Sequence, residues 1–121
     1  MLPVLPIRSL SAREIQTLPT AVLSDICRRW QVREFSLFGS VLREDFGAES
    51  DVDVLVSFEE SAPWSLWDLM DLQDELQTLF GRPVDLVEPE AIRNPFRRKE
   101  ILETRRVLFS NSVRAQTVWS V

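Results

Sequence analysis

Two aspartates separated by one residue, Asp51 and Asp53, carry the clearest chemical signal in the sequence. They stand at the start of residues 52–58, whose β-branched side chains predict a strand. Side chains alternate along a strand, so both carboxylates lie on one face, roughly 7 Å apart. Like charges at this spacing repel each other, and a divalent cation between them compensates for the repulsion. Taken alone, the pattern also fits two exposed aspartates on an edge strand.

A Gly-Ser pair, Gly39 and Ser40, ends the preceding predicted strand and opens a segment that can form a helical turn. Glycine permits close backbone approach, and the N–H groups of such a turn can bind phosphate together with the serine hydroxyl. A Gly-Ser pair by itself is more often an ordinary turn. Arg43 either adds positive charge to this phosphate site or pairs with Glu44 or Asp45.

A third carboxylate, Asp85, lies at the centre of residues 83–87, a short apolar segment that is predicted to be a strand. A charged side chain buried in such a strand needs a partner, because its desolvation is costly. A metal ion provides that partner, whereas an edge-strand aspartate that faces solvent needs none. We therefore take Asp85 as a third candidate metal ligand and keep the exposed alternative open.

The residue types that this sequence lacks narrow its chemistry. There is no histidine, no tyrosine and only one cysteine, Cys27. Imidazole bases and ligands, tyrosine nucleophiles, an internal disulfide and a multi-cysteine zinc cluster are thereby excluded. Metal binding and acid–base chemistry fall to carboxylates, and oxygen ligands favour Mg²⁺ or Mn²⁺ over zinc or copper. Cys27 has apolar neighbours and is expected to pack in the core.

The charge of the chain argues against direct binding to duplex DNA. The formal net charge is -5 at pH 7, whereas duplex-binding proteins normally show a basic stripe. Basic residues nevertheless concentrate in one C-terminal segment, with Arg93, Arg97, Arg98, Lys99, Arg105 and Arg106. This segment is either a solvated helix face or a surface that meets phosphate or an acidic partner.

Hydropathy predicts a soluble protein with no membrane association. No apolar run approaches the roughly 20 residues that a membrane-spanning helix needs. The first ten residues are interrupted by Pro3 and Pro6 and lack a charged start, so we do not expect a secretory signal. A single cysteine also suits a reducing compartment, and we expect the protein in the cytoplasm.

Helical and strand patterns alternate along the chain. Ser11 and Glu14 form a capping-box pattern and Thr20 is a second candidate cap, which predicts one broken helix or two short ones before residue 30. Gly81 ends a longer helix, and Pro95 begins a final helix that continues to residue 109. The predicted helices after the first cap cover residues 21–30, 67–80 and 95–109, and the predicted strands cover residues 34–38, 52–58 and 83–87.

This alternation predicts an α/β or α+β fold in which helices cover a small mixed sheet. A chain of 121 residues has room for one domain with its own core. We therefore expect a single domain over residues 1–121, with residues 1–10 as an N-terminal extension and residues 110–121 as a C-terminal tail.

In order and spacing, these residues resemble the nucleotidyltransferase superfamily related to DNA polymerase beta, and in particular its minimal-nucleotidyltransferase antitoxin branch. The family pattern is Gly-Ser, ten residues, Asp-x-Asp, and a later aspartate on a neighbouring strand. This chain matches the pattern with Gly39-Ser40, Asp51-x-Asp53 and Asp85. Members often carry arginine directly after the serine and glycine after the next arginine, where this chain has Val41 and Glu44. That departure bears on phosphate affinity and leaves the metal site unchanged.

The resemblance implies a nucleotidyltransferase fold and a Mg²⁺- or Mn²⁺-dependent transfer of AMP from ATP. The Gly-Ser pair would bind the terminal phosphates, and the Asp-x-Asp pair would bind two metal ions. Arg43 is kept as a further candidate nucleotide-binding residue. Asp85 would hold the catalytic metal and accept the proton of the acceptor hydroxyl. Such an arrangement stabilises the charge that develops during phosphoryl displacement.

The resemblance also implies a protein partner. In this branch the acceptor is typically a tyrosine of a cognate HEPN-domain ribonuclease toxin, so we expect a hetero-oligomer with a toxin, with residues 93–106 as part of the contact surface. One alternative is transfer to a small hydroxylated molecule such as an aminoglycoside, although no additional substrate-binding domain is expected. Another is a non-catalytic antitoxin that occludes its toxin, which the three aspartates disfavour and which Val41 and Glu44 keep open.

Overall fold

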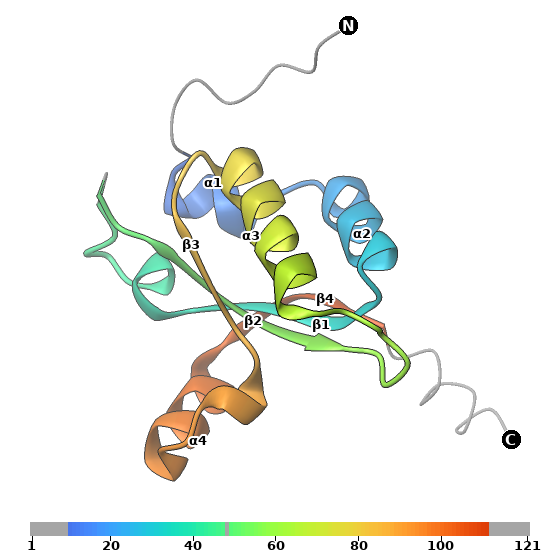
Figure 1. The fold of residues 1–121 in the computed structure, drawn as a ribbon. Helices are drawn as coiled ribbons and strands as arrows, with labels where there is room; N and C mark the ends of the chain where they lie inside the picture. Colours follow the sequence, from blue (N-terminus) through green and yellow to red (C-terminus); the bar gives the residue numbers. More distant parts are fainter. Residues whose placement is uncertain (1–9, 48, 112–121) are drawn as a thin grey trace, which may run out of the picture.

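The computed structural model describes residues 10–47 and 49–111. Its strands form one sheet in the order β3-β2-β1-β4 (Figure 1). The strands are β1 (Val32–Phe38), β2 (Val52–Phe58), β3 (Val84–Val87) and β4 (Arg106–Ser110). β1 is antiparallel to β2 and to β4, whereas β2 and β3 are parallel. The predicted small mixed sheet is confirmed, with β3 and β4 as its edges.

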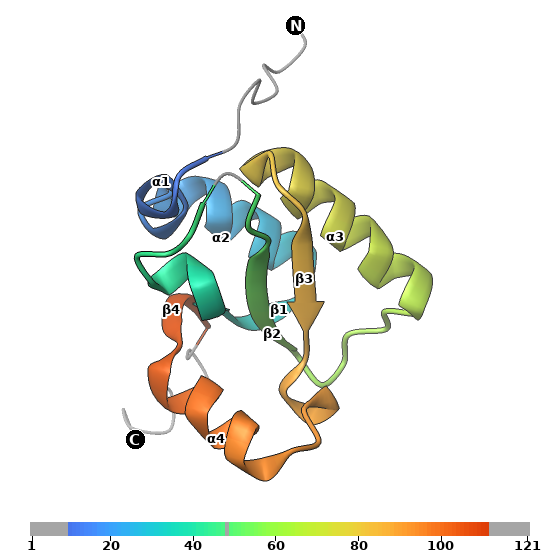
Figure 2. The ribbon, with the colours of Figure 1, turned by 90° about the vertical axis from the view of Figure 1, so that its left-hand side faces the viewer.

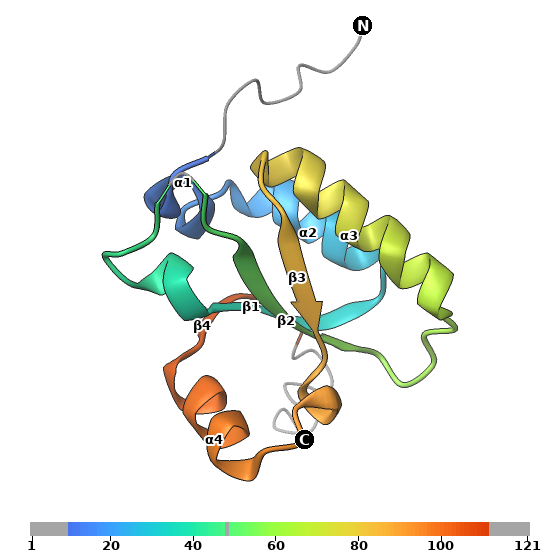
Figure 3. The same ribbon diagram turned by 60° about the vertical axis from the view of Figure 1, so that its left-hand side comes forward.

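Helices cover both faces of this sheet. Figures 2 and 3 show α1 (Ala12–Gln16), α2 (Thr20–Arg29) and α3 (Leu66–Phe80) over one face, and α4 (Pro95–Thr104) beyond the other. The main core lies between the sheet and the first three helices, with Ile15, Leu23, Leu72, Leu76, Phe35, Leu37 and Val54 among its buried side chains. A smaller apolar cluster on the α4 side contains Phe38, Leu55, Ile92 and Ile101. Cys27 is fully buried in the main core, and burial raises the pKa of its thiol to about 12.

Alternation along β2 assigns its side chains to two faces. Val52, Val54 and Val56 are fully buried and belong to the main core. Leu55 points the other way and joins the smaller cluster. Asp53, two residues before Leu55, shares its face because the side-chain period of a strand is two. Side-chain alternation along β2 therefore places Asp53 on the α4 side of the sheet.

The helix boundaries confirm most of the predicted caps. Ser11 and Glu14 form a reciprocal capping box, and Gly81 ends α3 in the left-handed conformation with φ 66°. The predicted Thr20 cap is wrong. Thr20 is the first residue of α2, and Pro19 occupies the N-cap position without a side-chain cap hydrogen bond. Proline fixes φ near the helical value, so it can start a helix without such a bond.

The predicted final helix is too long. α4 ends at Thr104, and the residues predicted as its last turn form the edge strand β4. Arg105 leaves the helix with an extended backbone, and its Nε donates to Oε2 of Glu34 on β1 at 2.7 Å. Leu108 and Phe109, which fit a helical stripe, instead pack against the main core. Local spacing could not distinguish the two structures, because pairing with β1 is a long-range interaction.

The predicted terminal extensions lie largely outside the described residues. Leu10 is described and donates its N–H to the carbonyl oxygen of Phe80 at 3.0 Å. Ser110 belongs to β4, so the sheet includes the first residue of the predicted tail. In the part of the chain that the structure describes, no helix is long and apolar enough to cross a membrane.

Candidate active site

The three predicted acidic residues come together where β2 begins. Asp53 and Asp85 are direct register partners on the parallel strands β2 and β3, and Asp51 immediately precedes β2. Asp53 is half-buried, whereas Asp51 and Asp85 are exposed. Asp85 therefore faces solvent from an edge strand and needs no partner to offset burial. Its position beside Asp53 keeps it a candidate ligand.

The carboxyl group of Asp53 is electrostatically perturbed. Burial raises its pKa, and the negative charges of Asp85 and Asp51 raise it further. The positive charges of Arg97 and Arg43 act in the opposite direction. Desolvation and like charges both disfavour the ionised form of Asp53, so a cation bound near these carboxylates would stabilise that form.

Gly39 lies directly against this carboxyl group. Its φ of +78° is in the left-handed region that glycine tolerates best. A Cβ atom at this position would overlap Oδ2 of Asp53 and would lie 3.2 Å from its Cγ. Two separate constraints, backbone conformation and space, therefore require glycine at residue 39. The predicted turn is a 3-10 turn, η1 (Gly39–Leu42), which includes the Gly-Ser pair itself.

A cavity of about 280 Å³ joins the Gly-Ser pair to Asp53 and to α4. Its lining residues are Phe38, Gly39, Ser40, Arg43, Asp53, Arg97, Glu100, Ile101 and Thr104. The structure thus brings four predicted site residues together, while Asp51 and Asp85 are not among those that line this cavity. In the sequence, Arg97 was part of the basic C-terminal segment, which was either a solvated helix face or a surface that meets phosphate or an acidic partner. Residues three and four apart lie on the same face of a helix. This spacing could have placed Arg97 beside Ile101 and Thr104.

Arg43 has both of the environments that its sequence context allowed. Its Nε donates to Oδ1 of Asp45 at 3.3 Å, and both side chains are exposed. Arg43 also lines the cavity beside Ser40 and Asp53. Exposed ion pairs contribute little to stability, so the pair with Asp45 does not prevent Arg43 from turning toward a phosphate.

The donor chemistry at Asp53 fits a hard divalent cation. Its candidate ligands are oxygens, which Mg²⁺ and Mn²⁺ prefer, and their mutual repulsion already acts on Asp53. Among residues 10–47 and 49–111, no three acidic or cysteine side chains already form an arrangement that could hold a metal ion. A cation at Asp53 would therefore need the exposed Asp51 and Asp85 side chains to turn toward it.

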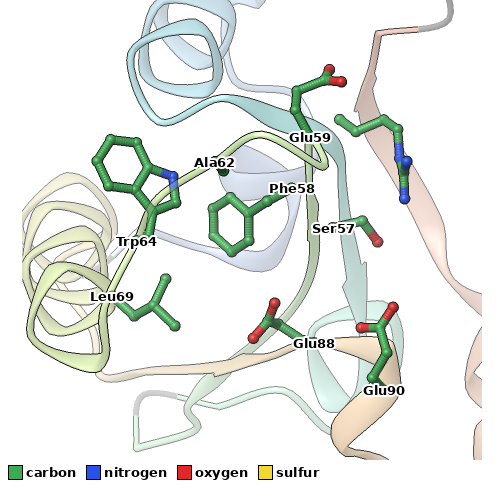
Figure 4. A pocket seen from close by; sticks show the side chains of 9 residues that line it. Ser57, Phe58, Glu59, Ala62, Trp64, Leu69, Glu88 and Glu90 are labelled. Atoms are coloured by element: carbon green, nitrogen blue, oxygen red, sulfur yellow. The ribbon is translucent and has the colours of Figure 1, made fainter.

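A second cavity, of about 230 Å³, lies beside the far end of β2 (Figure 4). Figure 4 shows the side chains of Phe58, Trp64 and Glu88 around it. Its lining residues are Arg33, Ser57, Phe58, Glu59, Ala62, Trp64, Leu69, Glu88 and Glu90. It shares no lining residue with the Asp53 cavity. The two cavities are separate: four predicted site residues line the one at Asp53, and none lines the second. Asp85 lines a further cavity, of about 320 Å³, together with Leu69 and Met70 of α3.

Comparison with known proteins identifies the fold. A protein adenylyltransferase, MntA of Thermococcus cleftensis, is 38% identical over 85 residues, which are 70% of this chain and 84% of that protein. A solved structure of a protein provisionally identified as a minimal nucleotidyltransferase superposes with a TM-score of 0.63 at 29% identity, covering 79% of this chain and 94% of the other. A crystal structure of a toxin-antitoxin with AMP-PNP superposes with a TM-score of 0.62 at 17% identity, covering 83% of this chain and 80% of the other, and shows likeness of fold alone.

The match to a family model covers the same elements that build the site. The nucleotidyltransferase domain model matches residues 20–108, from the start of α2 into β4. This range includes the Gly-Ser pair, all three aspartates and the α4 wall of the cavity. The chain therefore belongs to the nucleotidyltransferase domain family.

Proposed function

We propose that this chain is an antitoxin that transfers AMP from ATP to a tyrosine hydroxyl of a HEPN-domain ribonuclease toxin, with which it forms a hetero-oligomer. The observation that carries the proposal is the half-buried Asp53 carboxyl group, which lies against Gly39 in one cavity with Ser40. The adenylyltransferase relative and the toxin-antitoxin fold neighbour with AMP-PNP support this choice of reaction and acceptor class.

The phosphates of ATP would lie along the Gly-Ser side of the cavity. The backbone N–H groups of Gly39 and Ser40 and the Ser40 hydroxyl would donate hydrogen bonds to them. Arg43 and Arg97 supply positive charge from the loop and from α4. Their charge offsets the absence of an arginine at Val41, which is fully buried and belongs to the main core.

The three aspartates would hold Mg²⁺ or Mn²⁺, which neutralises triphosphate charge and polarises the reacting phosphate when bound. The acceptor oxygen forms a bond to the α-phosphorus, the bond to the bridging oxygen breaks, and pyrophosphate leaves. The chain has no histidine, so we assign the proton of the acceptor hydroxyl to a carboxylate. Asp85 is that carboxylate, because it is exposed to an incoming acceptor and lies beside Asp53.

The test is intact-mass spectrometry of both proteins after incubation with ATP and Mg²⁺, using the product of the neighbouring reading frame as the candidate toxin. We expect the partner to gain one or more AMP units. This chain has no tyrosine and so cannot be its own tyrosine substrate. The joint substitution of Asp51→Asn and Asp53→Asn should abolish the mass gain. Joint substitution of Asp71→Asn and Asp74→Asn, two exposed carboxylates on α3, is the matched control and should leave it unchanged.

The same variants separate catalysis from occlusion. A co-expression assay in cells measures protection from the toxin by each variant. If the Asp51→Asn and Asp53→Asn variant protects as well as the parent chain, occlusion rather than AMP transfer neutralises the toxin, and the proposed mechanism is wrong. Loss of protection with retained partner binding would support the transfer reaction.

A further inference from the structure

The buried guanidinium group of Arg82 joins three separate parts of the chain. Its Nη1 donates to the carbonyl oxygens of Gly47 at 2.7 Å and Ser50 at 2.9 Å, and its Nε donates to that of Leu10 at 2.8 Å. The guanidinium carbon lies 4.2 Å from the ring centroid of Phe46. Only 8% of the Arg82 residue surface is exposed. Arg82 is thus held by the loop between η1 and β2, which includes Phe46, and by Leu10, two residues before α1.

These contacts depend on the shape of the arginine side chain. A buried charge is costly unless hydrogen bonds and polarisable groups replace its water. The planar guanidinium has several donors in a rigid fork and a face that stacks on an aromatic ring. The carbonyl oxygen of Gly47 also accepts the N–H of Ser50 at 3.1 Å, so Arg82 binds two loop residues that already contact each other. The loop and Arg82 therefore stabilise each other.

The loop that Arg82 binds leads directly into the candidate metal ligands. Ser50 precedes Asp51, and its carbonyl oxygen is bound by the Arg82 side chain. Val52 follows Asp51, and its N–H donates to the carbonyl oxygen of Pro83 at 2.9 Å. Two consecutive residues, Arg82 and Pro83, therefore hold the backbone on both sides of Asp51. This arrangement restrains an exposed carboxylate that has no burial of its own to position it.

We propose that Arg82 is a positioning residue that sets the backbone of Asp51 for cation binding, an inference that rests on the proposed function. Arg82 acts through the carbonyl groups of Gly47 and Ser50. Its role is therefore to hold geometry, and a residue of equal charge and different shape should not replace it.

The first test measures the affinity of the protein for Mg²⁺ in the presence of a non-hydrolysable ATP analogue by isothermal titration calorimetry. Arg82→Lys keeps the charge and loses the fork, and Arg82→Met loses both. We expect each variant to bind Mg²⁺ about 10-fold more weakly or worse, the range seen when residues that orient metal ligands are replaced. Arg29→Lys is the matched control, because Arg29 is exposed on α2 and pairs with Asp25 and Glu75. It should bind Mg²⁺ like the parent.

The second test is amide hydrogen exchange without ligand, measured below the melting temperature of every variant. Arg82→Lys should accelerate exchange at residues 50–53 by about 10-fold or more relative to residues 35–37 of β1, because local opening is independent of global unfolding. Equal acceleration of both segments would indicate a general loss of stability and overturn the proposal. Equal Mg²⁺ affinity in the parent and both variants would overturn it too. A parent chain that does not bind Mg²⁺ and the analogue would instead refute the proposed function.

Discussion

At the scale of single residues, the site is defined by the contact between Asp53 and Gly39. The carboxyl group is half-buried, its pKa is raised, and it occupies the space that a Cβ at residue 39 would need. A larger side chain at residue 39 would displace the Asp53 carboxyl group, so the position of this charge depends on the glycine. Substitution of either residue tests this contact.

Asp53→Asn should not lower the stability of the ligand-free protein. The pKa of Asp53 is raised in the folded state. Protonated Asp53 therefore stabilises the fold below its pKa in the unfolded chain, and this stabilisation is lost as the pH rises through its pKa in the folded chain. At pH 7 the ionised group disfavours folding, and a neutral asparagine removes that cost. A thermal melt measures the effect. A clearly lower melting temperature would identify Asp53 as a structural residue.

The same variant should lose stabilisation by ligand. A ligand that binds only the folded state adds about 2.7 kcal/mol at about 100 times its Kd. We expect Mg²⁺ with ATP to raise the melting temperature of the parent and to leave that of Asp53→Asn unchanged. If Mg²⁺ with ATP raises the melting temperature of the variant as much as that of the parent, Asp53 is not a metal ligand.

Gly39→Ala should weaken both folding and nucleotide binding. A non-glycine residue in this sparsely populated conformation costs on the order of 1–3 kcal/mol, and the added methyl group would displace the Asp53 carboxyl group. Thermal melts with and without Mg²⁺ and ATP measure both effects. Gly47→Ala is the matched control, because a Cβ there meets nothing within 4 Å. Equal behaviour of the two variants would contradict the close approach at residue 39.

At the scale of elements, α4 completes the site from the opposite side of the cavity. Asn94 starts this helix by accepting hydrogen bonds from the N–H groups of Phe96 and Arg97 at 2.9 and 3.1 Å. Ile101 anchors the helix in the apolar cluster with Phe38 and Leu55. The helix therefore has a fixed start and one buried anchor, and Arg97 between them lines the cavity.

Arg97→Gln should weaken nucleotide binding without affecting the fold. Arg97 is exposed on α4 and acts electrostatically on Asp53. Loss of a charged hydrogen bond to phosphate costs about 1.5–3 kcal/mol, which corresponds to roughly 10- to 100-fold in affinity. Calorimetry with Mg²⁺ and the ATP analogue measures this loss. Lys99→Gln, which removes an exposed charge near Glu103 on the same helix, should bind like the parent. Equal affinity of the two variants would exclude a phosphate contact by Arg97.

At the scale of the whole molecule, the basic C-terminal segment divides into residues with different tasks. Arg98 donates to the carbonyl oxygen of Ile92, and Arg105 donates to Glu34. Arg97 lines the cavity at Asp53. The toxin-contact surface that we propose for residues 93–106 is therefore narrower than the sequence suggested. Its exposed basic members outside the cavity are Arg93, Lys99 and Arg106.

The sequence by itself determined the elements and the residues whose signals are local. The β-branched run of β2, the Ser11 capping box and Gly81 after α3 were correctly predicted, because each depends on residues close together in the chain. The family resemblance implied that the Gly-Ser and Asp-x-Asp pairs act on the same nucleotide, and the structure places Gly39 against Asp53.

Only the tertiary structure decided the features that depend on distant partners. Residues 106–110 are a strand because β1 offers them a backbone to pair with, although their spacing also fits a helix. Asp85 is exposed because β3 is the edge of the sheet. Arg97 acts electrostatically on Asp53, which is 44 residues away in the sequence. Arg82 binds the carbonyl oxygen of Ser50, which is 32 residues away. Such contacts arise from packing of the whole chain, so no local pattern in the sequence contained them.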